Sequence, residues 1–357
     1  MKIVVFTCST GGGHNSCAKY IASEFNKRNI ICDLKNYMEL AGKNASKKAE
    51  KMYLDSTKGK GNIFKTVYKL GELYNKTGIK SPVYAFNKLV VNKLDDYLTS
   101  NNYDLAIGTH VFPCLALTAL KKKKNIKFIN VATDYECIPF WNETNPDLFV
   151  IPSKLLIPKF VEKKINEEIL LPIGIPVASS FFENYEKINV PDDKKKVLLT
   201  SGSMGFGEVK ECVNKILEEI DCYLIVVCGT NKELKEDLDK INNSNLYVLG
   251  FINNMNSYMK NSDIIIAKPG GLTSTEITMM RKPFVIMMPI PGVENYNAKF
   301  FSDNGMGLYA SDVNEVVLCT KRILENKELE SNMIENQKKY INDKSASDLV
   351  QYVKKWM

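Results

Sequence analysis

Near its N-terminus the chain reads Ser9-Thr10-Gly11-Gly12-Gly13-His14-Asn15-Ser16, shortly after the apolar segment Ile3-Val4-Val5-Phe6, which has the composition of a buried strand. Three consecutive glycines permit a sharp turn and a close approach of a ligand to the backbone. The following residues, from about 16 to 28, have the pattern of a helix, whose N-terminus presents unpaired N–H groups and the positive end of a dipole. Strand, loop and helix together predict a site for an anion, most often a phosphate group, at Gly12 and Gly13.

His14 lies at the mouth of this predicted anion site, and the chain contains only one other histidine. An imidazole that can accept a proton next to a bound anion is a candidate general base. The alternative is a purely structural turn, because glycine-rich strand-to-helix turns are common and the stretch matches neither GxGxxG nor a P-loop. From these residues alone, both interpretations remain open.

Length and charge indicate two domains and one strongly basic segment. At 357 residues, of which 45% are apolar, the chain is long enough for two domains of ordinary size. The net charge is +7, and residues 41–93 contain twelve lysines against three acidic residues. Such a segment indicates an anionic partner, either a membrane surface or a nucleic acid, or else a solvated lysine-rich face. Residues 42–98 have an amphipathic helical pattern, typical of helices that lie on a membrane or pack on their own domain.

The nine cysteines are scattered, without a CxxC pair or a Cys/His spacing suited to zinc. They lie mostly in apolar segments and are expected to be small buried hydrophobic residues. The first residues do not resemble a signal peptide, and no apolar segment is long enough to span a bilayer. These features predict a protein of the reducing cytoplasm that can meet a membrane only at its surface.

Short apolar segments alternate with helical patterns in both halves of the chain, which is typical of parallel sheets covered by helices. The predicted strands are 3–6, 31–34, 104–108, 127–132 and 148–151 in the first half, and 196–200, 223–228, 246–251, 263–267 and 283–287 in the second. A polar, charged linker at 183–196 separates the halves. We therefore expect an N-terminal domain over residues 1–180, a C-terminal domain over 181–341, and a helix within 342–357 that packs back toward the N-terminal domain.

Polar residues follow three predicted strands of the first half. They are the glycine-rich loop with His14, the pair Thr109-His110, and the pair Thr133-Asp134. Because open parallel sheets bind ligands at the carboxyl ends of their strands, we expect these residues to face one crevice, with a structural role favoured for His110. Asp134 is a second catalytic candidate, which either orients an acceptor or polarises His14; the alternative is that it caps the next turn.

Two further glycine-rich turns occur in the second half. One, at 201–207, contains Ser203 and Met204. The other, Lys268-Pro269-Gly270-Gly271-Leu272-Thr273, leads into a helix expected at 274–280. Backbone N–H groups near its end are suited to a phosphate.

Three polar residues near these turns are candidates for hydroxyl recognition. Glu276, expected in the first turn of its helix, could accept hydrogen bonds from ribose hydroxyls or simply favour the helix dipole. Glu294 and Asn295 follow a turn rich in proline and glycine. They suit either the hydroxyls of a sugar or the ordinary polarity of a loop.

Together these motifs resemble the diacylglycerol glycosyltransferases, which include the monogalactosyldiacylglycerol synthases and bacterial diacylglycerol glucosyltransferases. That family is related to the lipid-linked N-acetylglucosaminyltransferase of peptidoglycan synthesis. The resemblance is carried by Ser-Thr-Gly-Gly-Gly-His near the N-terminus and by Pro-Gly-Gly-Leu-Thr, Glu276, Glu294 and Asn295 in the second half. It implies an α/β GT-B fold, with two Rossmann-like parallel-sheet domains and a cleft between them. The implied activity is inverting transfer of a hexose from a UDP-sugar, which is a substrate, without a bound metal or another cofactor.

The resemblance also implies residue roles. His14 would be the general base on the acceptor hydroxyl. Donor-binding residues would border the uracil (Phe251, Ile252), hold the ribose (Glu276), bind the diphosphate (Gly271, Leu272, Thr273), reach the sugar (Glu294, Asn295) or line the site (Gly12, Gly13, Ser203, Met204). Helix N-termini and backbone N–H groups can stabilise the leaving UDP in place of a metal, and the sequence has no DxD-like acidic pair at a strand end.

The acceptor side departs from the pattern of the family. Many lipid galactosyltransferases carry His-Pro-x-Trp after the Thr-Asp pair, whereas this chain has Ile138 in the His position, followed by Pro139-Phe140-Trp141. Phe140 and Trp141 are candidates for contact with an acyl chain, or for packing in the core.

We expect UDP-glucose or UDP-galactose as the donor and a membrane lipid, above all diacylglycerol, as the acceptor. The protein would reach this lipid as a peripheral protein on the inner, anionic face of the cell membrane, without nucleic acid as a partner. Two alternatives remain. One is transfer of N-acetylglucosamine to a polyprenyl-linked cell-wall precursor, and the other is a non-catalytic nucleotide-sugar-binding protein at the membrane.

Overall fold

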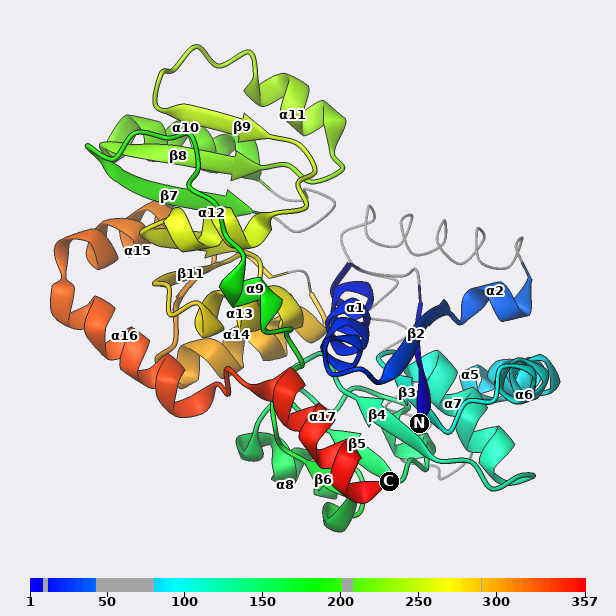
Figure 1. Cartoon of the computed structure of the whole chain (residues 1–357). Helices are drawn as coiled ribbons and strands as arrows, with labels where there is room; N and C mark the ends of the chain where they lie inside the picture. Colours follow the sequence, from blue (N-terminus) through cyan, green and yellow to red (C-terminus); the bar gives the residue numbers. More distant parts are fainter. Residues whose placement is uncertain (9–11, 43–79, 201–207, 290) are drawn as a thin grey trace. The chain divides into compact units, whose positions relative to one another are not determined.

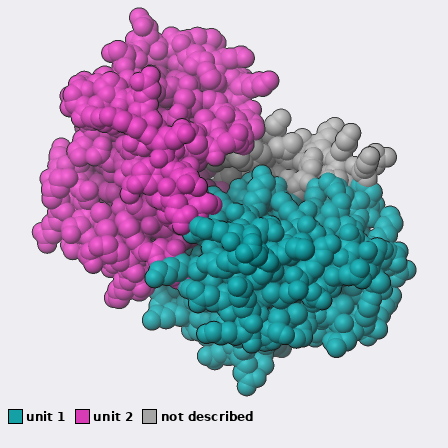
Figure 2. Space-filling model, viewed as in Figure 1, with its two compact units in different colours: residues 1–179, 291–293, 344–357 teal, residues 180–290, 294–343 magenta. Residues whose placement is uncertain are grey.

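The computed structural model describes residues 1–8, 12–42, 80–200, 208–289 and 291–357. The chain forms two compact units, namely unit 1 (1–179, 291–293 and 344–357) and unit 2 (180–290 and 294–343), coloured separately in Figure 2. Each unit contains one six-stranded sheet. Within the part of the chain that the structure describes, no helix is long and apolar enough to cross a membrane.

The sheet of unit 1 is parallel throughout and has the strand order β2-β1-β3-β4-β5-β6 (Figure 1). Its strands are β1 (Lys2–Thr7), β2 (Ile31–Asn36), β3 (Leu105–Gly108), β4 (Phe128–Val131), β5 (Leu148–Val150) and β6 (Leu170–Leu171). β3, β4 and β5 are buried along their whole length, as expected for a parallel sheet covered on both faces. The strand order reverses between β1 and β3, and ligands bind outside the carboxyl ends of the strands at such a point.

The helices of unit 1 are α1 (Gly12–Lys27), α2 (Met38–Ala41), α5 (Pro82–Lys88), α6 (Val91–Ser100), α7 (Val111–Lys121), α8 (Ile157–Glu162) and α17 (Ser345–Trp356), with 3-10 turns η1 (Trp141–Glu143), η2 (Lys154–Leu156) and η3 (Glu167–Ile169). α17, red in Figure 1, ends the chain and contacts α1. It buries Leu349, Val350 and Val353, which recur at helical spacing. The last helix therefore packs on the unit that contains the N-terminus.

Unit 2 repeats the parallel arrangement with the strand order β12-β11-β10-β7-β8-β9. Its strands are β7 (Lys195–Thr200), β8 (Cys222–Val227), β9 (Leu246–Leu249), β10 (Ile264–Ala267), β11 (Phe284–Met287) and β12 (Leu308–Ala310). Its helices are α9 (Ser180–Glu183), α10 (Val209–Glu219), α11 (Lys232–Leu238), α12 (Met255–Asn261), α13 (Gly271–Met279), α14 (Val293–Asp303), α15 (Val313–Glu325) and α16 (Lys327–Tyr340). Here the order reverses between β7 and β10, which is the Rossmann arrangement.

Two helices begin earlier than the sequence predicts. α1 begins at Gly12 instead of about residue 16, and α13 begins at Gly271 instead of Ser274. Glycine disfavours helices by only about 1 kcal/mol, so tertiary packing readily outweighs its propensity. His14 therefore lies in the first turn of α1. Glu276 lies in the second turn of α13, where the helix dipole no longer explains it.

All nine cysteines are buried and none forms a disulfide, which confirms the prediction that they are small buried hydrophobic residues. Burial is also the main cause that raises the pKa of eight of these thiols, to about 12 for Cys137. Such thiols stay protonated at neutral pH and are poor nucleophiles.

Helix α1 also binds residues next to two of the points where the chain passes between the units, namely the first exit from unit 1 and the last return to it. Buried Glu24 accepts hydrogen bonds from the backbone N–H (3.0 Å) and the hydroxyl (3.1 Å) of Ser179, the last residue before unit 2. Arg28 forms an ion pair with Glu24 and donates to the hydroxyl of Ser347 at 2.8 Å, just after the chain returns. The exit and the return are thus fixed to one helix.

Candidate active site

The first predicted site lies where the strand order of unit 1 reverses. His14 follows the carboxyl end of β1, Thr109 follows β3, and Thr133 follows β4. His14 Nδ1 lies 2.9 Å from the carbonyl oxygen of Thr109 and 2.8 Å from the hydroxyl oxygen of Thr133. The Thr109 hydroxyl donates to the His14 carbonyl at 3.1 Å. The predicted proximity of His14 and Thr133 is confirmed, and the structure adds the Thr109 carbonyl to the same group of contacts.

Gly108, the last residue of β3, makes this arrangement possible. A Cβ at Gly108 would lie 2.3 Å from Sγ of Cys114, which belongs to the first turn of α7. Glycine alone lets α7 begin directly against the end of β3. The intervening Thr109, whose carbonyl contacts His14, is therefore held in place.

These contacts select the tautomer of His14. A carbonyl oxygen only accepts hydrogen bonds, so Nδ1 carries the proton that the Thr109 carbonyl accepts. In the neutral ring, Nε2 then keeps its lone pair and can take a proton. Thr109 and Thr133 are buried, whereas His14 is partly exposed. The sequence identifies neither threonine as functional, because Thr109 acts through its backbone and hydroxyls at strand ends are common.

His110 packs against His14, with 4.8 Å between the ring centroids and an interplanar angle of 79°. Its Nδ1 accepts a hydrogen bond from the N–H of Phe112 at 3.2 Å and caps α7. Burial first, and the nearby His14 second, lower the pKa of His110 well below its ordinary value of 6.5. His110 is thus a neutral structural residue beside the candidate base, which agrees with the favoured interpretation.

The lowered pKa of His110 predicts a loss of stability in acid. The unfolded chain binds this proton more tightly than the folded protein, so the free energy of unfolding decreases as the pH falls below about 6.5, until the folded-state pKa is passed. The substitution His110→Asn keeps a capping side chain and removes the titration. Between about pH 7.5 and about pH 5.5, the midpoint of thermal unfolding should fall less for this variant than for the unchanged protein. An equal fall in both proteins would contradict this origin.

The acceptor-side candidates have different surroundings. Phe140 is partly exposed and has a left-handed backbone (φ 77°) just before η1, which is unusual for a bulky residue. Trp141 is 2% exposed and packs edge to face on Phe149, with 5.0 Å between the ring centroids. It belongs to the core and offers almost no surface for the predicted contact with an acyl chain. Asp134 is partly exposed next to Thr133, and its catalytic role stays a prediction.

The second predicted site lies where the strand order of unit 2 reverses. The carboxyl end of β10 leads through Lys268-Pro269-Gly270 into α13. Gly270 is the N-cap, no side chain caps the helix, and its first turn contains no acidic residue. The N–H groups at the start of α13 (Gly271, Leu272, Thr273) thus face no acidic side chain of their own turn, which suits a phosphate. Asn297 fixes the preceding loop by donating to the Pro269 carbonyl at 3.0 Å.

Three carboxylate or amide candidates accompany this helix start. Glu276 is 8% exposed on α13. The sequence predicts a loop for Glu294 and Asn295, but both lie in the first turn of α14. Glu294 is partly exposed, and Asn295 is exposed. An acidic side chain in the first turn is favoured by the helix dipole, so Glu294 helps to stabilise the start of α14. Their contacts with ribose and sugar stay predictions.

The remaining donor candidates are spread over several segments. Phe251 is 62% exposed after β9, and Ile252 is partly exposed. Gly12 and Gly13 are exposed at the start of α1, whereas Ser203 and Met204 lie outside the described residues. Among residues that the structure describes, no group of three or more His, Cys, Asp and Glu side chains could hold a metal ion.

Lys268 is a member of this region that the sequence analysis does not single out. It is 8% exposed, and burial lowers the pKa of its ammonium group, with Glu294 acting in the opposite direction. Titratable groups with a shifted pKa in such positions often belong to functional sites. In the sequence, the role of Lys268 is indicated only by its position between a predicted strand and a glycine-rich turn.

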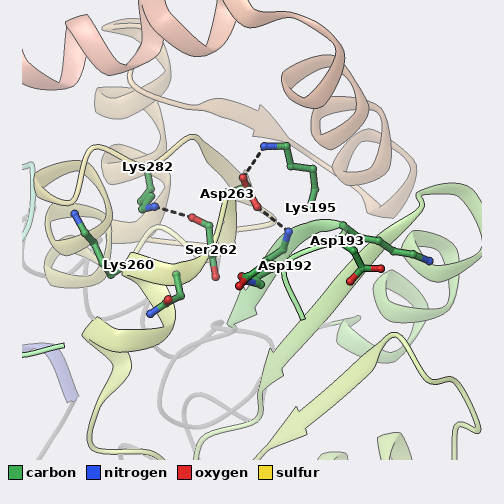
Figure 3. A pocket seen from close by; sticks show the side chains of 10 residues that line it. Asp192, Asp193, Lys195, Lys260, Ser262, Asp263 and Lys282 are labelled. Atoms are coloured by element: carbon green, nitrogen blue, oxygen red, sulfur yellow. Dashed lines mark hydrogen bonds and ion pairs between the residues drawn. The ribbon is translucent and has the colours of Figure 1, made fainter. Parts of the chain in front are cut away.

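A hollow of about 490 Å³ lies at the opposite edge of the unit 2 sheet, around the amino ends of β7 and β10 (Figure 3). It is lined by five lysines, three aspartates and two uncharged polar residues: Asp192, Asp193, Lys194, Lys195, Lys196, Lys260, Asn261, Ser262, Asp263 and Lys282. Lys195 pairs with Asp263 at 2.7 Å, and Lys282 donates to the Ser262 carbonyl at 2.7 Å. Because α/β sheets bind ligands at carboxyl ends, this hollow is separate from the predicted donor site.

Two family models match this chain, and the gap between them, at residues 178–195, includes the point where unit 1 passes into unit 2. Residues 14–177 match the family model for monogalactosyldiacylglycerol (MGDG) synthase, and residues 196–353 match that for the glycosyltransferase family 28 C-terminal domain. A relative from Bacillus cereus (strain 03BB102), named processive diacylglycerol beta-glucosyltransferase, is 29% identical over 341 residues, which cover 91% of this chain and 86% of the relative. The resemblance inferred from the motifs is confirmed.

Solved structures share the fold over nearly the whole chain. MurG from Acinetobacter baumannii matches with a TM-score of 0.63 and 15% identity, covering 99% of this chain and 100% of MurG. The spinosyn rhamnosyltransferase SpnG matches with a TM-score of 0.69 and 12% identity, covering 99% and 100%. At these identities the likeness concerns the fold alone. With the two parallel six-stranded sheets, it confirms the predicted GT-B fold.

Proposed function

Since this chain belongs to the glycosyltransferases that join an MGDG synthase domain to a family 28 C-terminal domain, we propose that it transfers a hexose from a UDP-sugar to a membrane lipid. Glycosyl transfer to a lipid is the activity that its relatives support. We propose glucose as the sugar and diacylglycerol as the lipid, because the Bacillus cereus relative is named for both. Galactose is the second candidate, because residues 14–177 match MGDG synthase.

The observation that carries this proposal is the contact of His14 Nδ1 with the Thr109 carbonyl, from which we infer the tautomer of the ring. Its Nδ1 proton is engaged by the Thr109 carbonyl, which leaves the Nε2 lone pair for catalysis. In the proposed reaction, Nε2 takes the proton of the acceptor hydroxyl, and the acceptor oxygen forms a bond to the anomeric carbon of the sugar. The bond from that carbon to the β-phosphate oxygen breaks, and its electron pair leaves with UDP. Attack opposite the leaving group inverts the anomeric configuration in one displacement.

Unit 2 is the proposed donor-binding unit. The start of α13, with Gly271, Leu272 and Thr273, would bind the diphosphate through backbone N–H groups. The buried carboxylate of Glu276 would accept hydrogen bonds from the ribose. Charge-assisted hydrogen bonds of this kind contribute about 1.5–3 kcal/mol each. The other donor contacts are proposed as the family resemblance implies them, with Phe251 and Ile252 at the uracil.

Helix α5 of unit 1 supports attachment to a membrane surface. Phe86 and Leu89 are 51% and 80% exposed and lie three residues apart, on one side of the helix. Lys88 and Lys93 are exposed close by in the sequence. Apolar side chains flanked by lysines suit the interface of an anionic bilayer. Most of the predicted basic segment, residues 43–79, lies outside the described residues. We propose that unit 1 binds the inner face of the cell membrane from the cytoplasm.

The proposed function is tested by incubating the full chain with radiolabelled UDP-glucose, UDP-galactose or UDP-N-acetylglucosamine and with vesicles that contain diacylglycerol. We expect labelled glycolipid from UDP-glucose, formed faster on anionic than on zwitterionic vesicles, because the lysines concentrate the protein at anionic lipid. Product from UDP-galactose alone would reassign the sugar.

Two other outcomes would overturn the proposal. Transfer only from UDP-N-acetylglucosamine, and only to a polyprenyl-linked acceptor, would assign the chain to cell-wall synthesis. Binding of UDP without transfer from any of the donors to any of these acceptors would favour a non-catalytic sensor of nucleotide sugars.

A further inference from the structure

Lys268 is a buried cation without a bonding partner. The residue is 8% exposed, and its ammonium group makes no hydrogen bond or ion pair with any residue that the structure describes. An ammonium group has three donors, and burying it without acceptors costs several kcal/mol or shifts its pKa. Burial does lower the pKa of Lys268, and the nearest charge that opposes this shift is that of Glu294 on α14. The side chain is thus almost fully enclosed, and its ammonium group has no acceptor among the described residues that would offset the loss of solvation.

The position explains what such a residue can do. Lys268 directly follows β10, next to the point where the sheet order reverses, and precedes α13 by only two residues. The start of α13 already presents the positive end of a helix dipole, without an acidic residue in its first turn. A buried ammonium group beside a second positive centre is unfavourable until an anion arrives. An incoming diphosphate would supply acceptors to both.

We propose that Lys268 binds the diphosphate of the nucleotide sugar and stabilises the negative charge that the leaving UDP gains during transfer. This inference rests on the proposed function and adds a residue to it. As the bond from the anomeric carbon to the β-phosphate oxygen breaks, the electron pair moves onto that oxygen, and the ammonium group of Lys268 neutralises it without giving up its proton. A cation fixed in advance in a water-poor site stabilises such charge strongly.

The chain offers a matched control in Lys282. It belongs to the same unit, is also partly buried, and burial also lowers the pKa of its ammonium group, with Lys260 as the second cause. Lys282, however, donates to the Ser262 carbonyl at the opposite, amino-end edge of the sheet (Figure 3). Its contacts are those of a structural lysine, at the opposite end of the strands from the predicted diphosphate site.

The test compares Lys268→Met, Lys268→Arg and Lys282→Met with the unchanged protein. Calorimetric titration with UDP and with uridine separates the diphosphate from the nucleoside. For Lys268→Met we expect the affinity for UDP to fall about 10- to 100-fold, as for loss of a hydrogen bond to a charged group, while the affinity for uridine is unchanged. Transfer at saturating donor should fall about 100-fold. Lys268→Arg keeps the charge and should retain part of both, whereas Lys282→Met should match the unchanged protein.

The midpoint of thermal unfolding distinguishes diphosphate binding from a structural role of Lys268. If Lys268 only stabilised the fold, Lys268→Met would lower this midpoint. Methionine has a similar volume and no charge, so Lys268→Met should raise the unfolding midpoint while it weakens UDP binding. A lower midpoint with unchanged affinity for UDP, or an equal loss of affinity for UDP and uridine, would overturn the inference. Failure of the unchanged protein itself to bind UDP would instead refute the proposed function.

Discussion

Replacing His14 by alanine is expected to lower the turnover number by roughly 10²- to 10⁴-fold, the usual contribution of a general base. Thr109 and Thr133 both contact Nδ1 of the His14 ring. These contacts orient the ring and leave the lone pair of Nε2 for the acceptor proton. The affinity for UDP should change little, because the residues proposed to border the uracil, hold the ribose and bind the diphosphate belong to unit 2. Radiolabelled transfer and calorimetric titration with UDP measure the two effects separately.

Variants at Thr133 serve as graded controls for this experiment. Thr133→Ser keeps the hydroxyl that lies 2.8 Å from His14 Nδ1, and should transfer at nearly the original rate. Thr133→Val removes the hydroxyl but leaves the Thr109 carbonyl in place, and should cause a smaller loss than His14→Ala, about 10-fold for one hydrogen bond. Undiminished turnover in His14→Ala would exclude His14 as the base.

Replacing Trp141 by alanine is expected to destabilise unit 1 by about 3–5 kcal/mol, the usual cost of truncating a buried aromatic residue. The indole is 2% exposed, and its edge-to-face contact with Phe149 would be lost together with its volume. Urea unfolding can follow this loss by fluorescence. The chain has two tryptophans, and Trp356, on α17 of unit 1, remains as the probe.

Phe140→Ala is the matched control for Trp141, since the two aromatic residues are adjacent and only Phe140 has an exposed surface. We expect little change in the free energy of unfolding of this variant, because the side chain is not part of the core. Its Michaelis constant for diacylglycerol should rise if Phe140 contacts the acceptor. A larger destabilisation by Phe140→Ala than by Trp141→Ala would mean that the assignment of core and acceptor residues is reversed.

The sequence predicts the architecture of this protein well, because alternation of apolar strands with helices and polar residues at strand ends are local signals. It predicts the starts of helices poorly. Gly12 and Gly271 are the first residues of helices, although glycine has a low helix propensity. Packing against distant parts of the chain determines where these helices begin. The error moves Glu276 by one turn, which changes the physical reason for its presence.

The site is predictable only where a side chain acts through its own chemistry. His14 and Asp134 can be nominated from residue type and position, whereas Thr109 contributes a carbonyl group that every residue possesses. Lys268 is hidden for a different reason. Its significance lies in burial without a partner, and burial of one lysine among many cannot be read from a lysine-rich sequence. Trp141 shows the converse, since an aromatic residue beside a motif suggests recognition but is packed in the core.

Because the first and the last crossing between the units are both bound to α1, residues 180–343 form a block that could be exchanged as a whole. Glu24 binds Ser179, and Arg28 binds Ser347. Both junctions of an exchanged segment between Ser179 and Ser347 would therefore lie next to the same helix, which remains in unit 1. A chimera that receives residues 180–343 from a relative with another sugar preference would keep the proposed base His14, the proposed membrane-binding helix α5 and the hydrogen bonds of Glu24 and Arg28. Sugar preference could then be inherited as a block, and the descent of such enzymes would proceed by recombination of donor halves as well as by point mutation.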